Sequence, residues 1–320
     1  MNNPKKLIVS HAPFIHIGSS IPQMNLHIIY AAIPAVLFGG ILRFGASAIA
    51  VVCFSVATAM LWEIAFNLAS KKPVTVGDGN AALIGLVFAM LMPSTAPWWF
   101  VLTGTFTAVV VGKMIFGGIG SNPFHPVALS VAILAVSWGD YLEFDYMYRH
   151  FQLDFAATYP LADLKYFGMD AIKNIHLSDL LLGRQIGGIG AINGLCLILG
   201  GIYLMMRGFI RWEISISFLA GIFLAALLFN VIGPGRYADP FFHLLSGYTL
   251  IAAFFLAPED SSSPVNTIPM LIYGVMGGIM TILIRNIGTY VDGAILSILI
   301  INLLNPLLDK IRPKALGKVE

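Results

Sequence analysis

Long apolar runs separated by short polar links make up most of the chain. A helix that crosses the hydrocarbon core of a membrane needs about 20 mostly apolar residues, and ten runs come close to that requirement. They cover roughly residues 24–43, 45–69, 79–93, 97–116, 123–139, 186–206, 210–232, 240–257, 267–286 and 290–307. The pattern therefore predicts an all-α polytopic membrane protein.

Three of these predicted spans, the third, fifth and eighth, are short and carry proline at their ends. The prolines are Pro93, Pro123, Pro126, Pro240 and Pro258. Helices interrupted within a membrane are tolerated where protein or a cavity surrounds the freed backbone groups. We therefore expect these three spans to be broken or re-entrant helices.

The ten spans divide into two sets of five at a polar segment, residues 140–185. Because five is an odd number, the second set would be inverted relative to the first, as in many transporters. We predict a cytoplasmic segment at 1–23, a first repeat at 24–139, an outer loop at 140–185, a second repeat at 186–307 and a cytoplasmic tail at 308–320. The alternative is that the two halves share only the likeness of any two sets of apolar helices.

Composition and charge narrow the function. The chain is 58% hydrophobic and 11% charged, which excludes a water-soluble fold. A formal net charge of +2 gives no excess of positive charge for binding nucleic acid. Basic residues collect in links on the side of the N-terminus, among them Lys71, Lys72, Arg207 and Arg211, so both termini are expected in the cytoplasm, with the chain in the cell (inner) membrane.

One acidic residue, Glu63, lies alone in the second span. A charge at the centre of a spanning helix costs about 2.5 to 3.5 kcal/mol on insertion scales, so it requires a reason. Glu63 has two equally supported interpretations. It lies on an ion or proton path, or it is a carboxyl group paired with another side chain inside the bundle. No catalytic constellation and no metal-ligand cluster is recognisable, so any redox chemistry must come from a bound cofactor.

Polar residues also collect where helices are expected to break. Asn122 precedes the fifth span, and Arg236 and Asp239 precede the eighth. Free backbone N–H groups at such places can bind an anion or the polar edge of a flavin. Capping of the helix is the commoner use of an aspartate there.

Four segments carry a resemblance to a known family. They are VGDGNAALIG at 76–85, PWW at 97–99, GKMIFGGIGSNPFHP at 112–126 and GPGRYADPFFHLLSG at 233–247. Together they resemble the NqrB/RnfD family, whose members belong to the Na⁺-translocating NADH:quinone reductase and to the Rnf electron-transport complex. The resemblance covers almost the whole chain.

The resemblance implies a membrane subunit that relays electrons between ferredoxin and NAD, coupled to translocation of Na⁺ or H⁺, with RnfA, RnfB, RnfC, RnfE and RnfG as partners. It also implies FMN joined by a phosphoester to a threonine in a motif similar to Ser-Gly-Ala-Thr. The comparable stretch here is DFAATYPL at 154–161, which makes Thr158 the candidate, although Phe155 and Ala156 replace the Ser and Gly.

A second, noncovalent flavin such as riboflavin is implied as well. The resemblance assigns it no residues, and Asn122, Arg236 and Asp239 are candidate contacts because they stand at expected helix breaks where polar groups converge. Two rival interpretations remain open. One is a channel or secondary transporter that acts alone, because an inverted repeat with broken helices suits solute passage equally well. The other is a flavin-free scaffold within the same complex.

Overall fold

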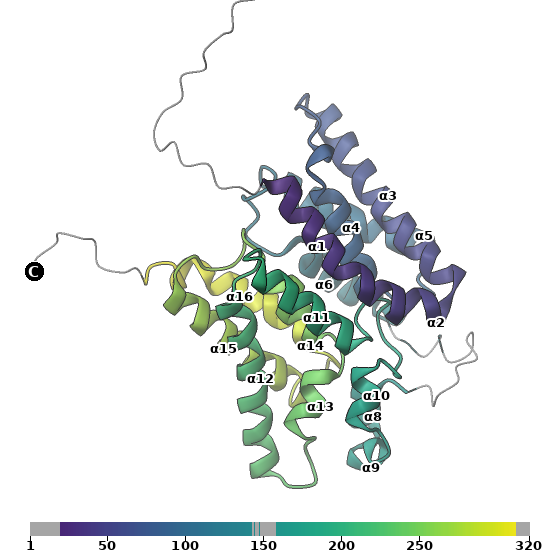
Figure 1. The fold of residues 1–320 in the computed structure, drawn as a ribbon, viewed down its shortest axis with the longest axis vertical. Helices are drawn as coiled ribbons and strands as arrows, with labels where there is room; N and C mark the ends of the chain where they lie inside the picture. The colour runs from purple at the N-terminus through teal and green to yellow at the C-terminus, as the bar shows by residue number, and fades with distance from the viewer. Residues whose placement is uncertain (1–19, 143, 145–146, 148–157, 312–320) are drawn as a thin grey trace, which may run out of the picture.

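The structure, a computed structural model, describes residues 20–142, 144, 147 and 158–311. Within these residues every regular element is helical and no strand occurs (Figure 1). The N-terminal half contains α1 (Ile21–Ala35), η1 (Val36–Ile41), α2 (Leu42–Phe44), α3 (Ala46–Ala69), η2 (Val76–Asp78), α4 (Asn80–Leu91), α5 (Trp98–Phe106), η3 (Thr107–Met114), α6 (Pro126–Trp138) and η4 (Gly139–Leu142).

Three short helices connect the halves: α8 (Pro160–Phe167), α9 (Met169–Ile172) and α10 (Leu177–Leu181). The C-terminal half contains α11 (Gly194–Met206), α12 (Trp212–Ile232), α13 (Pro240–Leu245), α14 (Thr249–Ile251), η5 (Ala252–Leu256), α15 (Thr267–Asn286) and α16 (Ala294–Leu308).

Among the described residues, four helices are long and apolar enough to cross a membrane: Ile21–Phe44, Ala46–Ala69, Trp212–Ile232 and Thr267–Asn286. Five shorter apolar helices accompany them. Large apolar side chains face outward, including Leu42, Val136 and Leu228 at 70%, 73% and 60% exposure. A surface of that kind is suited to lipid rather than water.

Small residues bring the long helices together. A Cβ atom on Gly278 of α15 would lie 2.3 Å from the carbonyl oxygen of Phe218 on α12. A Cβ atom on Gly221 of α12 would likewise lie 2.4 Å from the carbonyl oxygen of Val275. Close approach through glycine is typical of helix pairs in membranes, where dispersion contacts replace the hydrophobic effect.

An expected break is found in one of the three short spans, the eighth, where α13 ends at Leu245 before a turn at Ser246 and Gly247, whose φ is +64°. The third and fifth spans are short helices without an internal break, α4 from Asn80 to Leu91 and α6 from Pro126 to Trp138. Proline at the first position of a helix loses no intrahelical hydrogen bond, so Pro126 starts the helix rather than breaking it.

The expected start of the sixth span, residue 186, is wrong, because α11 begins at Gly194. Residues 186–193 are non-helical and bond to the end of α4: the Ile189 and Gly190 amides donate to the carbonyls of Met92 and Met90, each at 3.0 Å. A Cβ atom on Gly188 would lie 2.6 Å from the Met90 oxygen, so glycine permits this close approach. The Asn193 side chain then caps α11 by accepting from the Cys196 amide at 3.1 Å.

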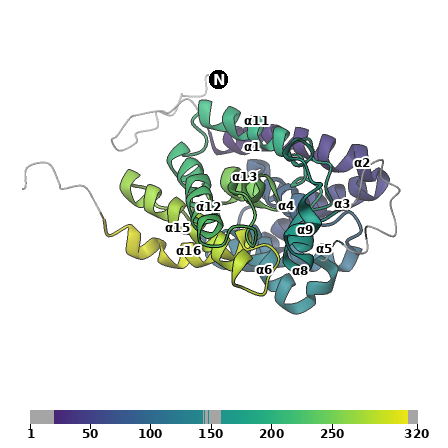
Figure 2. The ribbon, with the colours of Figure 1, turned by 90° about the horizontal axis from the view of Figure 1, so that it is seen from below.

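The helices end at two opposite faces of the bundle. We call the face where α1 begins and α16 ends the pocket face, after the cavity described below; it carries the links 115–125 and 257–266. The loop face carries residues 158–193, the end of α4 and the start of α16. Helices α1 and α11 lie side by side along one flank in both views (Figures 1 and 2).

Candidate functional site

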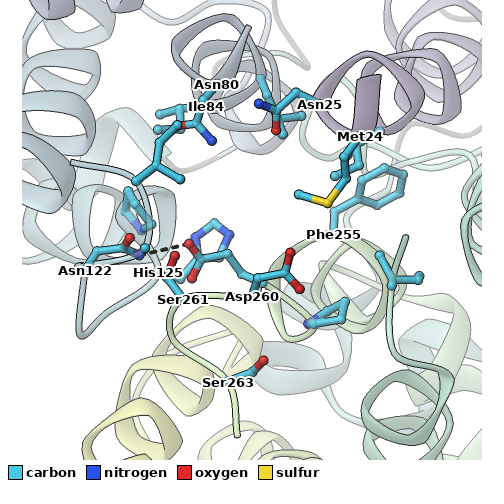
Figure 3. Close-up of a pocket in the computed structure, with 18 of the residues that line it drawn as sticks. Met24, Asn25, Asn80, Ile84, Asn122, His125, Phe255, Asp260, Ser261 and Ser263 are labelled. Atoms are coloured by element: carbon cyan, nitrogen blue, oxygen red, sulfur yellow. Dashed lines mark hydrogen bonds between the residues drawn. The ribbon is translucent and has the colours of Figure 1, made fainter. Parts of the chain in front are cut away.

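A cavity of about 480 Å³ opens between the two halves at the pocket face. Asn25 and Asn80 line it from the first half, and Asp260, Ser261 and Ser263 line it from the opposite wall (Figure 3). Apolar groups fill the spaces between these polar groups, Ile84, Val87, Phe254 and Phe255 among them. A few converging polar groups in a mostly apolar cavity of this size are typical of a small-molecule site.

Asn122 joins the two halves at the edge of this cavity. Its side-chain amide donates to Glu259 at 2.9 Å, the dashed line in Figure 3, and to the Phe124 carbonyl at 3.0 Å. Glu259 also accepts from the hydroxyl of Ser262. Burial raises the pKa of Glu259 above its usual range, and these hydrogen bonds only partly offset that effect.

The neighbouring Asp260 is affected in the same direction. Burial and repulsion by Glu259 raise its pKa, while Arg211 works against the shift. The cavity wall therefore holds two adjacent carboxyl groups that are both harder to ionise than in water. Sequence reasoning missed both, since acidic residues in a Pro-Glu-Asp-Ser link are usually solvated.

A buried ion pair borders the same cavity. Lys113 lines it, and its Nζ atom lies 3.1 Å from Oε2 of Glu63, with side-chain exposures of 3% and 0%. The second oxygen of Glu63 accepts from the Thr75 hydroxyl at 2.5 Å, and Asn67 donates to that hydroxyl at 3.1 Å. Glu63 is therefore a paired carboxylate, and its role on an ion path stays a prediction.

Thr158 lies half-buried on the loop face, while residues 154–157 of its motif lie outside the described residues. Its carbonyl accepts from the Ile186 amide at 2.9 Å, which aligns it with the segment that bonds to α4. Tyr159 is buried with its ring 4.8 Å from that of Phe144, and Pro160 begins α8. Buried neighbours thus anchor Thr158 in place.

A second buried cation orders the loop face. Arg285 pairs with Asp292 at 2.9 Å and donates to the carbonyls of His243 and Ser246 and to the Thr249 hydroxyl, so it closes the break after α13. Arg285 was not singled out from the sequence alone. The available signal was a lone cation near the end of one apolar span and a lone anion, Asp292, at the start of the next.

The structure does not bring all the predicted flavin contacts together. Asn122 lines the cavity, whereas Arg236 and Asp239 are exposed in the link between α12 and α13 and are absent from its lining. Arg236 lies over the Tyr237 ring at 5.4 Å, and Asp239 caps α13 by accepting from the Phe241 amide at 2.9 Å.

The family of the chain follows from its similarity to known proteins. A model of the NQR2, RnfD, RnfE family matches residues 8–317. The chain belongs to this family. The sequence-based resemblance is thereby confirmed, and the apolar helices of this NQR2, RnfD, RnfE family member belong to a multi-pass membrane protein.

Relatives match the family member over nearly their whole length. The D subunit of the Na⁺-translocating ferredoxin:NAD⁺ oxidoreductase complex of Acetobacterium woodii is 33% identical, covering 96% of this chain and 94% of the relative. The D subunit of the ion-translocating oxidoreductase complex of Alcanivorax borkumensis is 31% identical, covering 95% and 94%. The D subunit of the proton-translocating ferredoxin:NAD⁺ oxidoreductase complex of Clostridium ljungdahlii is 30% identical, covering 94% and 93%.

Proposed function

We propose that this chain is the RnfD membrane subunit of an ion-translocating ferredoxin:NAD⁺ oxidoreductase complex, in which it relays electrons and couples their passage to movement of Na⁺ or H⁺. The observation that carries the proposal is the nearly full-length match to relatives that are all named as the D subunit of such complexes. The other subunits of an Rnf-type complex would be its partners. The relatives include a sodium and a proton translocator, so the proposal covers either ion.

Covalent FMN on Thr158 is part of the proposal. A phosphoester needs a threonine hydroxyl that can be reached, and the half-buried Thr158 on the loop face offers one. A bound flavin accepts and donates electrons, which apolar helices cannot do by themselves. The backbone contact to Ile186 and the buried Tyr159 would hold the attachment point in a fixed place beside the segment that bonds to the end of α4.

A second, noncovalent flavin such as riboflavin is proposed for the cavity on the pocket face. The lining suits a flat ring with polar edges, since the side chains of Asn25, Asn80 and Asn122 lie among apolar side chains. Asn305 strengthens the fit: it lines the cavity, and its Oδ1 atom is buried without a hydrogen-bond partner among the described residues. A buried acceptor of that kind calls for a donor from a ligand or water. Arg236 and Asp239 do not line this cavity, and their contact with a flavin stays a prediction.

The ion path is proposed to pass the Glu63–Lys113 pair. The pair forms part of the cavity wall and lies inside the first half of the helix bundle. Ionisable residues inside a membrane protein commonly lie on ion or proton paths.

We also propose that the chain crosses the cell (inner) membrane ten times, in two inverted repeats. The pocket face and both termini would then lie on the cytoplasmic side. A matching pair of hydrogen bonds supports the repeat: Thr107 bonds Ser130 at 2.7 Å between the fourth and fifth spans, and Thr281 bonds Ser297 at 2.8 Å between the ninth and tenth. The basic residues of the pocket face support the orientation.

The decisive experiment is purification of the chain, in its complex, from its native host. The peptide that contains Thr158 should carry an FMN-sized mass increment, and the band on a denaturing gel should fluoresce. Thr158→Ala should abolish both signals, whereas Ser178→Ala, an exposed hydroxyl in the same connecting segment, should keep them. Fluorescence that survives Thr158→Ala rejects the site, and a colourless chain that transports solute in liposomes favours the lone transporter.

A further inference from the structure

Three side chains from the adjacent helices α1 and α11 meet at the pocket face. The two helices lie side by side along one flank of the bundle (Figures 1 and 2). His27 lies on α1, and Tyr203 and Arg207 lie at the end of α11 and just after it. The Nδ1 atom of His27 is 2.6 Å from the Tyr203 hydroxyl, and its Nε2 atom is 3.2 Å from Nη2 of Arg207. We call these three residues the basic cluster.

The direction of each hydrogen bond follows from the arginine. A guanidinium can only donate, so Nε2 of His27 must accept and carries no proton. The imidazole proton is then on Nδ1, which donates to the oxygen of Tyr203. That leaves the hydroxyl proton of Tyr203 free to donate elsewhere, together with the other N–H groups of Arg207.

Among the described residues no carboxylate pairs with the cluster, since none of the ion pairs there involves Arg207. The Phe209 ring holds the cluster in shape, since it stacks on His27 with ring centres 4.9 Å apart and lies 5.8 Å from the guanidinium carbon. A preorganised set of donors with a net positive charge is complementary to an anion, and a phosphate oxygen can take several such hydrogen bonds at once.

The residues around the basic cluster indicate which class of anion it binds. The cluster lies at the ends of its helices, where a spanning bundle meets the headgroup region, and apolar side chains flank it on the outer surface. Tyr30, Leu26 and Met206 are 55%, 45% and 83% exposed. A ligand here must therefore have an anionic head and an apolar body. Basic sites between spanning helices at the membrane boundary bind anionic lipid headgroups in this manner.

We propose that the basic cluster is a binding site for an anionic phospholipid, with the headgroup phosphate on Arg207 and Tyr203 and the acyl chains along α1 and α11. The site lies on the outer flank of the bundle and needs no flavin, so it is independent of the electron-transfer proposal. Its structural consequence is that one lipid would bridge the first helix of each half.

The test uses the full chain, in its complex, in detergent with measured amounts of lipid. Native mass spectrometry should show retention of phosphatidylglycerol in preference to phosphatidylcholine with the same acyl chains. Arg207→Gln should weaken retention of phosphatidylglycerol about fivefold, the effect of losing one basic contact at a membrane surface. Tyr203→Phe should weaken it by less, because the charge remains.

Arg236→Gln provides the matched control. Arg236 is also an exposed arginine over an aromatic ring, but it lies on the loop face and has no histidine partner in contact among the described residues. Its substitution should leave lipid retention unchanged. Thermal stability with each lipid serves as a second measurement: phosphatidylglycerol should raise the melting temperature of the original chain more than that of Arg207→Gln.

Several outcomes would overturn the assignment. Equal retention of phosphatidylglycerol by the original chain and Arg207→Gln would remove the site, and equal retention of both lipids would remove its selectivity for anionic headgroups. Displacement of the lipid by millimolar inorganic phosphate would show that the cluster binds free phosphate instead. If Arg207→Gln fails to assemble, Tyr203→Phe decides, since it removes one hydroxyl and retains the aromatic packing.

Discussion

The Nζ atom of Lys165 lies 2.8 Å from the carbonyl oxygen of Gly288, and it also donates to the carbonyls of Arg285 and Tyr290. One ammonium group thus satisfies three backbone acceptors where α15 ends. Lys165 belongs to α8, which begins two residues after Thr158. Lys165 is therefore one of the contacts that tie the candidate attachment residue to the second half of the molecule.

Lys165→Met should loosen this tie. The substitution removes a cation from the negative end of the α15 dipole and leaves three carbonyls without their donor, so we expect a loss of about 1.5 to 3 kcal/mol in the free energy of unfolding. Unfolding in detergent, followed by circular dichroism, measures the loss. If Thr158 carries FMN, the flavin fluorescence of the band should also fall.

Lys173→Met is the matched control for Lys165→Met. Lys173 is in the same connecting segment and pairs with Asp170 at 2.5 Å, but both side chains are largely exposed. Ion pairs in water contribute little to stability, so this variant should unfold like the original chain. Equal destabilisation by both lysine substitutions would mean that the contacts of Lys165 have no special role.

The Glu63–Lys113 pair predicts strong coupling between two substitutions. Either Glu63→Gln or Lys113→Met alone leaves a buried charge without its partner, which costs about 3 to 5 kcal/mol. The double variant removes both charges and should cost clearly less than the sum of the two. A double-mutant cycle of unfolding free energies measures the coupling, and additive losses would show that the two groups do not interact.

Glu259 predicts a dependence of stability on pH. Its pKa is raised in the folded state by burial, so the protonated carboxyl is favoured by folding. The contribution of Glu259 to the free energy of unfolding is therefore fully present at pH values below its pKa in the unfolded state. It is lost as the pH rises through its pKa in the folded state.

Glu259→Gln should remove that loss. Glutamine keeps an oxygen that can accept from Asn122 and carries no charge, so the variant should melt at a higher temperature than the original chain at about pH 8 and at a similar temperature at about pH 4. Thermal unfolding at the two pH values measures both. A variant that is less stable than the original chain at the higher pH would contradict the raised pKa.

The long helices could be predicted from the sequence because their signal is local. Helices α3, α12 and α15 begin and end within two residues of the expected spans, since a continuous apolar run defines each of them. Residues 186–193 could not be predicted in this way. They are apolar like a span, but their structure depends on contact with the end of α4, about 100 residues earlier in the chain.

The site was partly predictable for the same reason. Glu63, Lys113, Arg285 and Asp292 are recognisable as lone charges in or beside apolar runs. Which of them pair depends on which helices are neighbours, and hydropathy does not contain that information. Asn122 lies in the link before α6, next to the expected fifth span, but its partner Glu259 is 137 residues away.

The contact between α12 and α15 gives a further prediction. A Cβ atom on Gly278 would meet the backbone of α12 at 2.3 and 2.5 Å, and backbone atoms cannot rotate away as a side chain can. Gly278→Ala should therefore push the two helices apart and cost about 1 to 3 kcal/mol, the usual cost of overpacking. Gly139→Ala is the control, because no atom of the described residues lies within 4 Å of the added carbon and its φ of −55° suits alanine. We expect the control to be neutral or slightly stabilising, and equal losses in the two variants would contradict close packing at Gly278.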